Sequence, residues 1–468
     1  MEAVIGQIES LLDGFAAFMW GPPLVVLLVG GGLFFVIHSA LLPYRHFGHA
    51  LGILRGKYDD ASDPGDVSHF RALTTALSGT LGLGNIAGVA VAITVGGPGA
   101  IFWMWITALV GIATKFYTCT LAILYRGRDS LGHLQGGPMY IVREGLGRRW
   151  LPLAFLFAVA GMLGTLPVFQ VNQLVQIVRD IIAVPAGWTS ADDHLLFDFV
   201  MGVSVAALVL AVVVGRIQRV GLVTGWLVPS MVGLYLVLTF YILGTHASEV
   251  PAAFALIFRD AFMGEAVAGG ILGAVIVTGV RRGAFSNEAG IGTEVMAHGA
   301  ARTREPVREG LVAMLGPVID TLIVCTCTAL ALLVTGVWTE SEMEGVSLTA
   351  EAFETALPGF GAWALTLMVV MLSLSTILTF WYYGSKCLGF LVGAEYQHHY
   401  IWIYTLLILA GAVVTLDAVL GLIDGMYAVM AIPTMTASLL LAPRVKEAAR
   451  DYFRRRRGNF ADEADHEY

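Results

Sequence analysis

The sequence predicts an all-α polytopic membrane protein with eleven transmembrane helices, from its composition, its recurrent apolar segments and two glycine-rich interruptions of those segments. Of its 468 residues, 57% are hydrophobic and 13% are charged, and the mean hydropathy is +0.76. These values lie outside the range of soluble globular proteins. The apolar runs continue along the whole chain, so we expect no separate soluble domain.

The predicted helices are placed in chain order from hydropathy, from the Gly and Pro residues that interrupt apolar segments, and from runs of charged residues. Residues 1–17 have no Lys or Arg before the first apolar run, so they predict an amphipathic helix on the membrane surface rather than a secretory signal peptide. The predicted crossings are 18–42, 68–96, 98–125, 151–183, 196–215, 221–244, 266–300, 308–337, 361–394, 399–420 and 424–443.

Charge placement predicts the orientation of the chain in the lipid bilayer. Most of the 27 Lys and Arg residues lie in alternate loops and in the tail 444–468, which is basic and then acidic. The positive-inside rule places these segments in the cytoplasm, and therefore the N-terminus outside and the C-terminus inside. The net charge of −8 belongs mainly to loops, and we expect no nucleic-acid partner and no obligatory protein partner. The four cysteines fall in apolar segments, which favours core packing over a disulfide or a metal site.

The stretch SGTLGLGNIAG, residues 78–88, interrupts the second predicted crossing. Each interior glycine costs a helix ~1 kcal/mol relative to alanine, so the cluster predicts an unwound segment. Close helix packing is the alternative explanation of the glycines. Asn85 favours a binding site, because a buried amide is costly in a purely packing role. Freed N–H groups at such a break suit a carboxylate, and freed carbonyl groups suit a small cation.

A second interruption, GVRRGAFSNEAGIG, occupies residues 279–292 in the seventh predicted crossing. We expect Ser286 and Glu288 to cap and begin the helix that restarts there. Arg281 and Arg282 need partners at membrane depth, and Glu288 and Asp320 are the candidates; if the helix instead ends at Arg282, both arginines are cytoplasmic flanks.

Paired interruptions in crossings two and seven are typical of transporters built from two inverted five-helix repeats. The repeats would span 68–244 and 266–443, with 18–42 as an additional N-terminal helix. A channel would need repeated polar rings, and an enzyme would need a nucleophile–base pair or a metal cluster, neither of which the sequence presents at a credible spacing. We therefore expect neither enzymatic activity nor a cofactor.

The adjacent hydroxyl residues Ser375 and Thr376 lie in the ninth predicted crossing. With the carbonyl group of Leu372, one turn earlier, they form half of an oxygen cage suited to a hard cation. A single such hydroxyl usually bonds to its own helix, so the adjacent pair is the informative feature.

Three segments carry a family resemblance: GGPGAIFWMWITALVG (96–111), QGGPMY (135–140) and RGAFSNEAGIGT (282–293). They resemble the alanine or glycine:cation symporter family of prokaryotes, and the resemblance runs through crossings two to eleven. It implies a leucine-transporter-type fold in the cell (inner) membrane and sodium-coupled uptake of a small neutral amino acid by alternating access. A proton-coupled carrier of a slightly larger neutral amino acid is the alternative.

The resemblance also implies the positions of the site. The substrate would contact the segment GLGN at 82–85, one residue of the fourth crossing and the second interruption. These positions are Leu83, Gly84, Asn85, Gln170, Phe285, Ser286, Asn287 and Phe380. The fold type adds Ser78 and Leu81 to the cation ligands Leu372, Ser375 and Thr376. The family commonly has TIGTGN where this chain has TLGLGN, and Trp where it has Phe380, so the choice among alanine, glycine and serine stays open.

Overall fold

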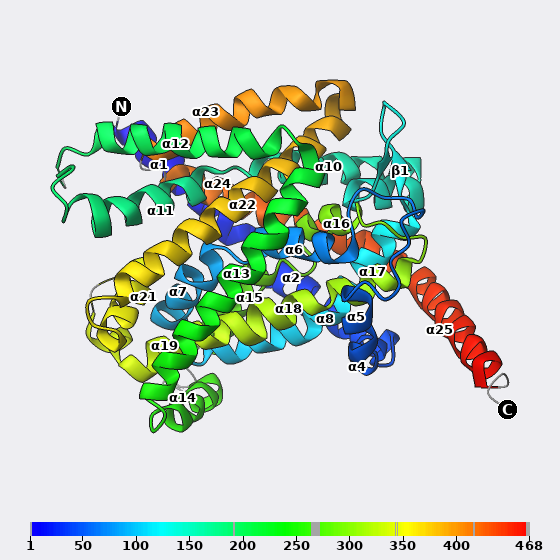
Figure 1. Ribbon diagram of the computed structural model, residues 1–468, viewed down its shortest axis with the longest axis horizontal. Helices are drawn as coiled ribbons and strands as arrows, with labels where there is room; N and C mark the ends of the chain where they lie inside the picture. The colour runs from blue at the N-terminus through cyan, green and yellow to red at the C-terminus, as the bar shows by residue number, and fades with distance from the viewer. Residues whose placement is uncertain are drawn as a thin grey trace.

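A computed structural model describes residues 2–190, 192–263, 272–341, 343, 345–414 and 417–464, and this part of the chain is mostly helical (Figure 1). The helices of the first half are α1 Glu2–Met19, α2 Pro22–Val25, α3 Gly31–His38, α4 Leu42–Arg45, α5 Phe47–Leu54, α6 His69–Thr80, α7 Ala87–Gly96, α8 Ala100–Leu124, α9 Pro138–Tyr140, α10 Leu151–Gly164, α11 Val168–Val178, α12 Leu195–Val213, α13 Arg216–Thr245 and α14 Val250–Met263. Those of the second half are α15 Leu272–Asn287, α16 Thr293–His298, α17 Pro306–Ala313, α18 Leu315–Pro317, α19 Thr326–Thr335, α20 Val337–Glu340, α21 Gly345–Ala356, α22 Gly361–Val392, α23 Tyr400–Val413, α24 Asp417–Leu440 and α25 Ala442–Ala464.

Short elements connect or distort these helices. Two-residue strands β1 Gly127–Arg128 and β2 Leu134–Gln135 pair antiparallel, with Gly127 opposite Gln135. The 3₁₀ turns are η2 Leu83–Asn85, η4 Arg148–Trp150 and η8 Ala394–His399, and the π-helical segments are η1 Val26–Gly30, η3 Ile141–Leu146, η5 Arg179–Ala183 and η7 Val318–Cys325.

Within the described residues, eight segments are long and apolar enough to cross a membrane, or nine if one bent helix pair counts as a span. The eight are Glu9–His38, Ala100–Leu124, Arg148–Ala183, Leu195–Val213, Ile217–Thr245, Pro306–Thr335, Gly361–Val392 and Val419–Leu440. Helices α15 and α23, at the seventh and tenth predicted crossings, have 16 and 14 described residues. The polytopic all-helical class is confirmed, while the count of eleven, the inverted repeats and the domain boundaries stay predictions.

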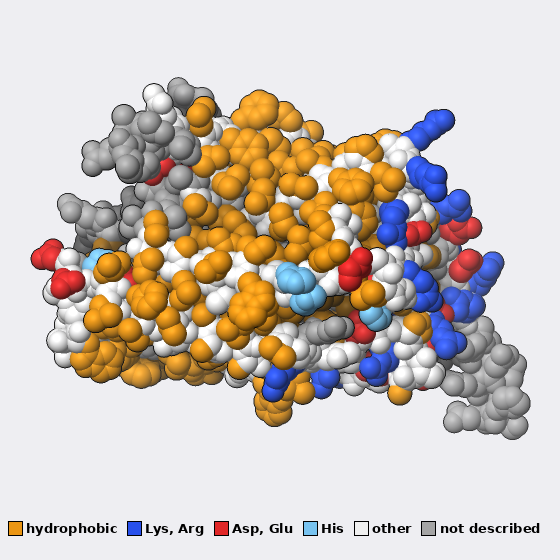
Figure 2. Space-filling model, turned by 90° about the horizontal axis from the view of Figure 1, so that it is seen from above, with side chains coloured by type: hydrophobic (Ala, Val, Ile, Leu, Met, Phe, Trp, Pro, Cys, Tyr) orange, Lys and Arg blue, Asp and Glu red, His pale blue; other side chains and the backbone are white. Residues whose placement is uncertain are grey.

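The charged side chains have a polarised distribution along the long axis of the molecule. Figure 2 shows Lys and Arg gathered at one end and hydrophobic side chains over most of the visible face. That end carries helix α25, and the N-terminus lies toward the opposite end (Figure 1). Helix α1 packs along α24, where Phe15 approaches Gly425. The distribution of Lys and Arg agrees with the expected cytoplasmic side, although the orientation itself stays a prediction.

The first interruption predicted from the sequence is confirmed. Helix α6 ends at Thr80, Gly82 is extended, and the helical path through η2 and α7 resumes at an angle of 62°. A Cβ atom at Gly82 would lie 2.9 Å from Thr376 Oγ1 of α22. Glycine therefore lets the unwound backbone approach α22 closely.

The second interruption is also confirmed, but it lies later than the expected helix start. Helix α15 continues to Asn287, and the break contains three left-handed residues, Glu288, Gly290 and Gly292. The prediction that Ser286 and Glu288 begin the next helix is wrong, because α16 begins at Thr293 after the N-cap Gly292. Asn287 Oδ1 instead accepts from the Ala289 N–H at 3.0 Å, which stabilises the turn before the left-handed residues.

Candidate substrate and cation site

Two adjoining cavities lie at the first interruption. The larger one, about 1030 Å³, is lined by parts of α1, α7, α11, α15, α21 and α24, and we call it the vestibule. The smaller one, about 30 Å³, is the central cavity, and its lining includes Gly84, Gln170, Phe285, Glu288, Phe380 and Tyr427. Gly84 and Phe285 border both spaces. The central cavity therefore lies next to the vestibule, and the two cavities share part of their lining.

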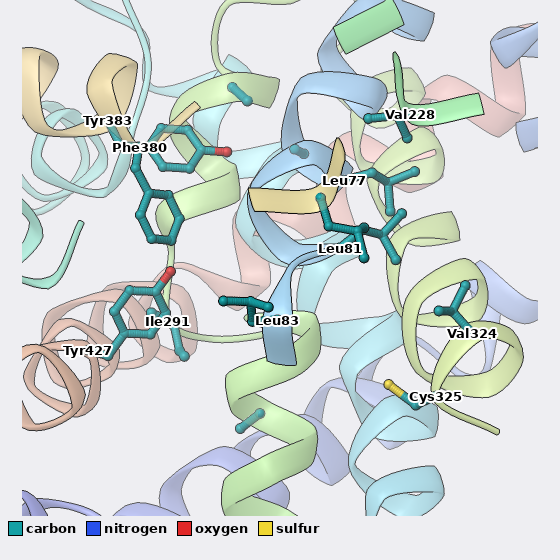
Figure 3. Close-up of a cluster of buried hydrophobic side chains, with 14 of the residues drawn as sticks. Leu77, Leu81, Leu83, Val228, Ile291, Val324, Cys325, Phe380, Tyr383 and Tyr427 are labelled. Atoms are coloured by element: carbon teal, nitrogen blue, oxygen red, sulfur yellow. The ribbon is translucent and has the colours of Figure 1, made fainter. Parts of the chain in front are cut away.

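Four residues expected at the substrate site line the central cavity: Gly84, Gln170, Phe285 and Phe380. The Tyr427 ring joins the two phenylalanines, with ring centroids 5.4 Å from Phe285 and 6.2 Å from Phe380. Figure 3 shows Phe380 and Tyr427 pointing toward one another, with Leu83 nearby. The sequence reasoning did not assign Tyr427 to the site, because a single tyrosine in an apolar segment carries no local signal of a cavity.

The other expected substrate residues lie outside the central cavity. Leu83 lines the vestibule. Asn85 is fully buried, and its Nδ2 donates to Asp320 Oδ1 at 2.5 Å while its Oδ1 accepts from the Gly82 N–H at 3.1 Å. Ser286 Oγ donates to Asp320 Oδ2 at 2.7 Å. The Asn85 amide thus supports the break and supplies a donor that the buried Asp320 carboxyl group needs.

Asn287 completes the polar layer behind the break. Its Nδ2 donates to Thr321 Oγ1 at 3.2 Å, and Thr321 Oγ1 in turn donates to Asp320 Oδ2 at 2.7 Å. These bonds join α15 to the π-helical segment η7. As direct substrate contacts, Asn85, Ser286 and Asn287 stay predictions without support from the cavity lining.

Oxygen atoms from α6 and α22 meet at the predicted cation position. Thr376 Oγ1 lies 3.0 Å from the carbonyl oxygens of both Ser78 and Leu372. Ser375 Oγ lies 2.8 Å from the Leu372 carbonyl oxygen and 3.5 Å from that of Ser78. We call these four oxygen atoms the cation cluster.

The chemistry of the cation cluster suits a hard monovalent cation, because its donors are neutral carbonyl and hydroxyl oxygens. All four residues are buried. The structure brings together four of the five expected ligands. The fifth, Leu81, is buried just after α6 and makes no hydrogen bond to either hydroxyl group in the described part of the chain.

Arg281 has a different partner from the two that the sequence suggested. It forms an ion pair with Asp424 of α24, and the Trp20 Nε1–H donates to the Asp424 carbonyl oxygen at 3.0 Å. Both Arg281 and Arg282 line the vestibule. The prediction of Glu288 or Asp320 as the Arg281 partner is wrong, because the fold brings Asp424, 143 residues away in the chain, beside Arg281, and such a tertiary contact has no local sequence signal.

A buried carboxylate–imidazole cluster joins α6, α16 and α17. The two carboxylate oxygens of Glu309 contact Nδ1 of His69 and Nδ1 of His298, and all three side chains are at most 1% exposed. Both imidazole Nε2 atoms are buried and have no hydrogen-bond partner in the part of the chain that the structure describes. Nearby, Arg126 donates to the carbonyl oxygens of Gly299 and Thr303 at 2.9 and 3.1 Å. These contacts tie together the ends of three helices, and the sequence reasoning missed them because the histidines are far apart along the chain.

Comparison with known proteins gives consistent results over nearly the whole chain. Residues 5–466 match the family model described as the sodium:alanine symporter family. The sodium/alanine symporter AgcS of Methanococcus maripaludis is 39% identical, with 92% of this chain and 94% of the relative covered. The probable sodium/glutamine symporter GlnT of Bacillus subtilis is 31% identical, with 98% and 92% covered. The solved structure of MhsT in complex with L-phenylalanine superposes with a TM-score of 0.57 over 81% of this chain and 89% of that chain, at 15% identity, which shows a shared fold.

Proposed function

Because the chain belongs to the sodium:alanine symporter family, we propose that it is a secondary active transporter that couples uptake of a small neutral amino acid, alanine or glycine, to sodium entry. The observation that carries this proposal is the cation cluster, in which neutral oxygens of α6 and α22 converge beside the broken helix. The transporter would lie in a prokaryotic inner membrane with its N-terminus outside and its C-terminus in the cytoplasm.

The substrate would occupy the central cavity with its carboxylate at the break. Leu83 and Gly84 begin the helical segment after the interruption, where N–H groups lack intrahelical acceptors and the positive end of the helix dipole favours an anion. Phe285 and Phe380 limit the space left for a side chain. This arrangement favours a methyl group or a hydrogen atom over a branched aliphatic side chain.

Sodium would act through the same stretch of backbone. A cation at the Ser78 carbonyl group holds the end of α6 against α22, and Gly79, Thr80, Gly82 and Gly84 of this stretch line the central cavity. Sodium and amino acid must then raise each other's affinity by the same factor. One cation that crosses down 100 mV supplies about 2.3 kcal/mol, before the contribution of its concentration gradient.

Alternating access would begin from the vestibule, which adjoins the central cavity on the side of α1. Opening toward the Lys- and Arg-rich end would require separation of the helix ends that Glu309 and Arg126 hold together. The two imidazole groups beside Glu309 are also the specific observation that favours the alternative, a proton-coupled carrier, because imidazole groups exchange protons near neutral pH.

Uptake of radiolabelled alanine and glycine into proteoliposomes tests the proposal. We expect rapid accumulation with an inward sodium gradient and little accumulation with an equal potassium gradient. A proton gradient imposed without sodium separates the two mechanisms. Accumulation driven by the proton gradient alone would replace the sodium proposal with the proton-coupled alternative, and no uptake of either amino acid under any gradient would reject the proposed substrate class.

A further inference from the structure

Glu288 gives the central cavity a negative side chain. Of the described residues that line this cavity, only Glu288 is charged. Its side chain is 1% exposed and lies in the second interruption, between α15 and α16. Burial of a carboxyl group is costly unless a partner compensates the charge, so the identity of that partner matters.

The backbone of Glu288 is held in an unfavourable conformation. Its φ angle is +56°, in the left-handed region that disfavours residues with a Cβ atom. The neighbouring left-handed positions Gly290 and Gly292 are glycines, which adopt this region without that cost. Strain of this kind is found at sites where it directs a side chain toward a ligand, and here the side chain reaches the central cavity.

The hydrogen bonds of Glu288 leave acceptor positions of its carboxylate free for further donors. The Tyr427 hydroxyl group donates to Oε1 at 2.5 Å, and the Thr293 hydroxyl group donates to Oε2. A carboxylate offers about four acceptor positions, so two neutral donors do not saturate it. Two buried side chains of opposite charge, the cationic Lys115 and the anionic Glu294, act electrostatically on the Glu288 carboxyl group. A ligand cation in the cavity would find an acceptor that the protein leaves available.

Gln170 provides the second, independent observation. This residue of α11 lines the same cavity and is 6% exposed, and its Oε1 is buried with no hydrogen-bond partner among the described residues. A buried carbonyl oxygen without a donor is costly, and a bound ligand that donates to it removes that cost. The cavity therefore presents a carboxylate and an unpaired amide oxygen, which together complement a group with several N–H donors.

We propose that Glu288 is the acceptor for the ammonium group of the transported amino acid, with Gln170 Oε1 as a second acceptor. This inference rests on the proposed function. With the substrate carboxylate at the N–H group of Gly84, which borders the central cavity, the zwitterion lies across this cavity between the two broken helices. The site then selects for a free α-amino group, and it discriminates against hydroxy acids of the same size, which lack the positive charge.

The experiment compares alanine with lactate, in which a hydroxyl group replaces the ammonium group. Full-length protein in detergent with saturating sodium is titrated with each ligand, and affinity is taken from the ligand-induced rise in melting temperature. The test variant is Glu288→Gln, which keeps the shape and removes the charge. The matched control is Glu294→Gln, a fully buried carboxyl group of α16 that lines neither cavity.

We expect Glu288→Gln to weaken alanine binding by about 10- to 150-fold, as for a lost hydrogen bond to a charged group, and to leave lactate binding little changed. The preference for alanine over lactate should fall by the same factor, while Glu294→Gln retains it. A purely structural role would weaken both ligands equally, so an unchanged preference in Glu288→Gln would overturn the inference.

A second variant keeps the test decisive if Glu288→Gln does not fold. Glu288→Asp keeps the charge but withdraws it by one methylene group, so the preference for alanine should fall while stabilisation by sodium alone persists; an unchanged preference again overturns the inference. The two proposals fail separately. A wild-type protein that responds to neither alanine nor glycine rejects the proposed function, whereas a wild-type response retained in full by both Glu288 variants rejects only the role of Glu288.

Discussion

Removal of one oxygen from the cation cluster is the most direct perturbation of the proposed coupling. Thr376 is fully buried in α22, and its hydroxyl oxygen lies 3.0 Å from the carbonyl oxygens of Ser78 and Leu372. Thr376→Val replaces the hydroxyl group with a methyl group of similar size. The substitution therefore removes a proposed cation ligand and leaves the packing between α6 and α22 nearly unchanged.

The size of the expected change in sodium affinity follows from the buried polar groups that lose a partner. A buried acceptor or bound ion deprived of one hydroxyl group loses ~1–3 kcal/mol, which corresponds to a rise of about 5- to 150-fold in the sodium concentration for half-maximal uptake. Because the substrate groups are untouched, the maximal uptake rate at saturating sodium should be largely retained. The expected signature is a shifted sodium dependence with a similar plateau.

The assay is initial-rate alanine uptake in proteoliposomes over a series of sodium concentrations. Thr366→Val is the matched control, because Thr366 lies in the same helix and its hydroxyl group donates to the Ala362 carbonyl oxygen at 2.8 Å, within its own helix. The control should keep the sodium dependence of the parent protein. A Thr376→Val protein with the parent's sodium dependence would show that the cation binds elsewhere.

Three further predictions follow from other contacts. Asn85→Ala deprives the buried Asp320 of a donor, so thermal unfolding should show a loss of ~1–3 kcal/mol in stability; lost alanine binding at an unchanged melting temperature would instead indicate direct substrate contact. Leucine should not displace bound radiolabelled alanine at equal concentration, because the aromatic side chains that line the central cavity cannot easily yield the volume of a branched aliphatic side chain, and effective displacement would contradict its role as the substrate site. The N–H groups of Ala362 and Gly359 donate to the Glu354 carboxylate and hold its pKa below the usual value. This contribution to stability exists above the unfolded-state pKa and is lost as the pH falls through the folded-state pKa. Glu354→Gln should accordingly lower the melting temperature at neutral pH and not in acid, and equal effects at both would refute this assignment.

Local sequence signals predicted the parts of the molecule that depend on local chemistry. The glycines around Gly82 weaken the helix wherever they occur, and the first interruption is where they predict it. Ser375 and Thr376 are adjacent on one helix, so their proximity required no knowledge of the fold. The role of Ser78 beside these two residues was implied only by the family resemblance, because the fold of the family already specifies which helices pack together.

Contacts between distant segments were not predictable in the same way. Asn85 looked like a ligand group because a buried amide needs partners, but its partner Asp320 is 235 residues away in the chain. Arg281 similarly meets Asp424, and the helix beside the second break starts later than expected, because left-handed residues replace the expected cap. In each case the residue type correctly indicated an unmet requirement, and only the packing of the helices determines which group meets it.

The backbone from Ser78 to Gly84 has a consequence for fidelity of transport. Its first residue supplies an oxygen to the cation cluster, and its last borders the central cavity, so a sodium ion and an amino acid bound as proposed would contact one short segment of backbone. A movement of this segment on binding of one ligand would then act directly on the site of the other. Slippage, in which the cation crosses alone, would require this backbone segment to adopt its ligand-bound shape without the amino acid. Substitutions that convert the carrier into a cation leak should therefore concentrate in these seven residues and in the side chains that touch them.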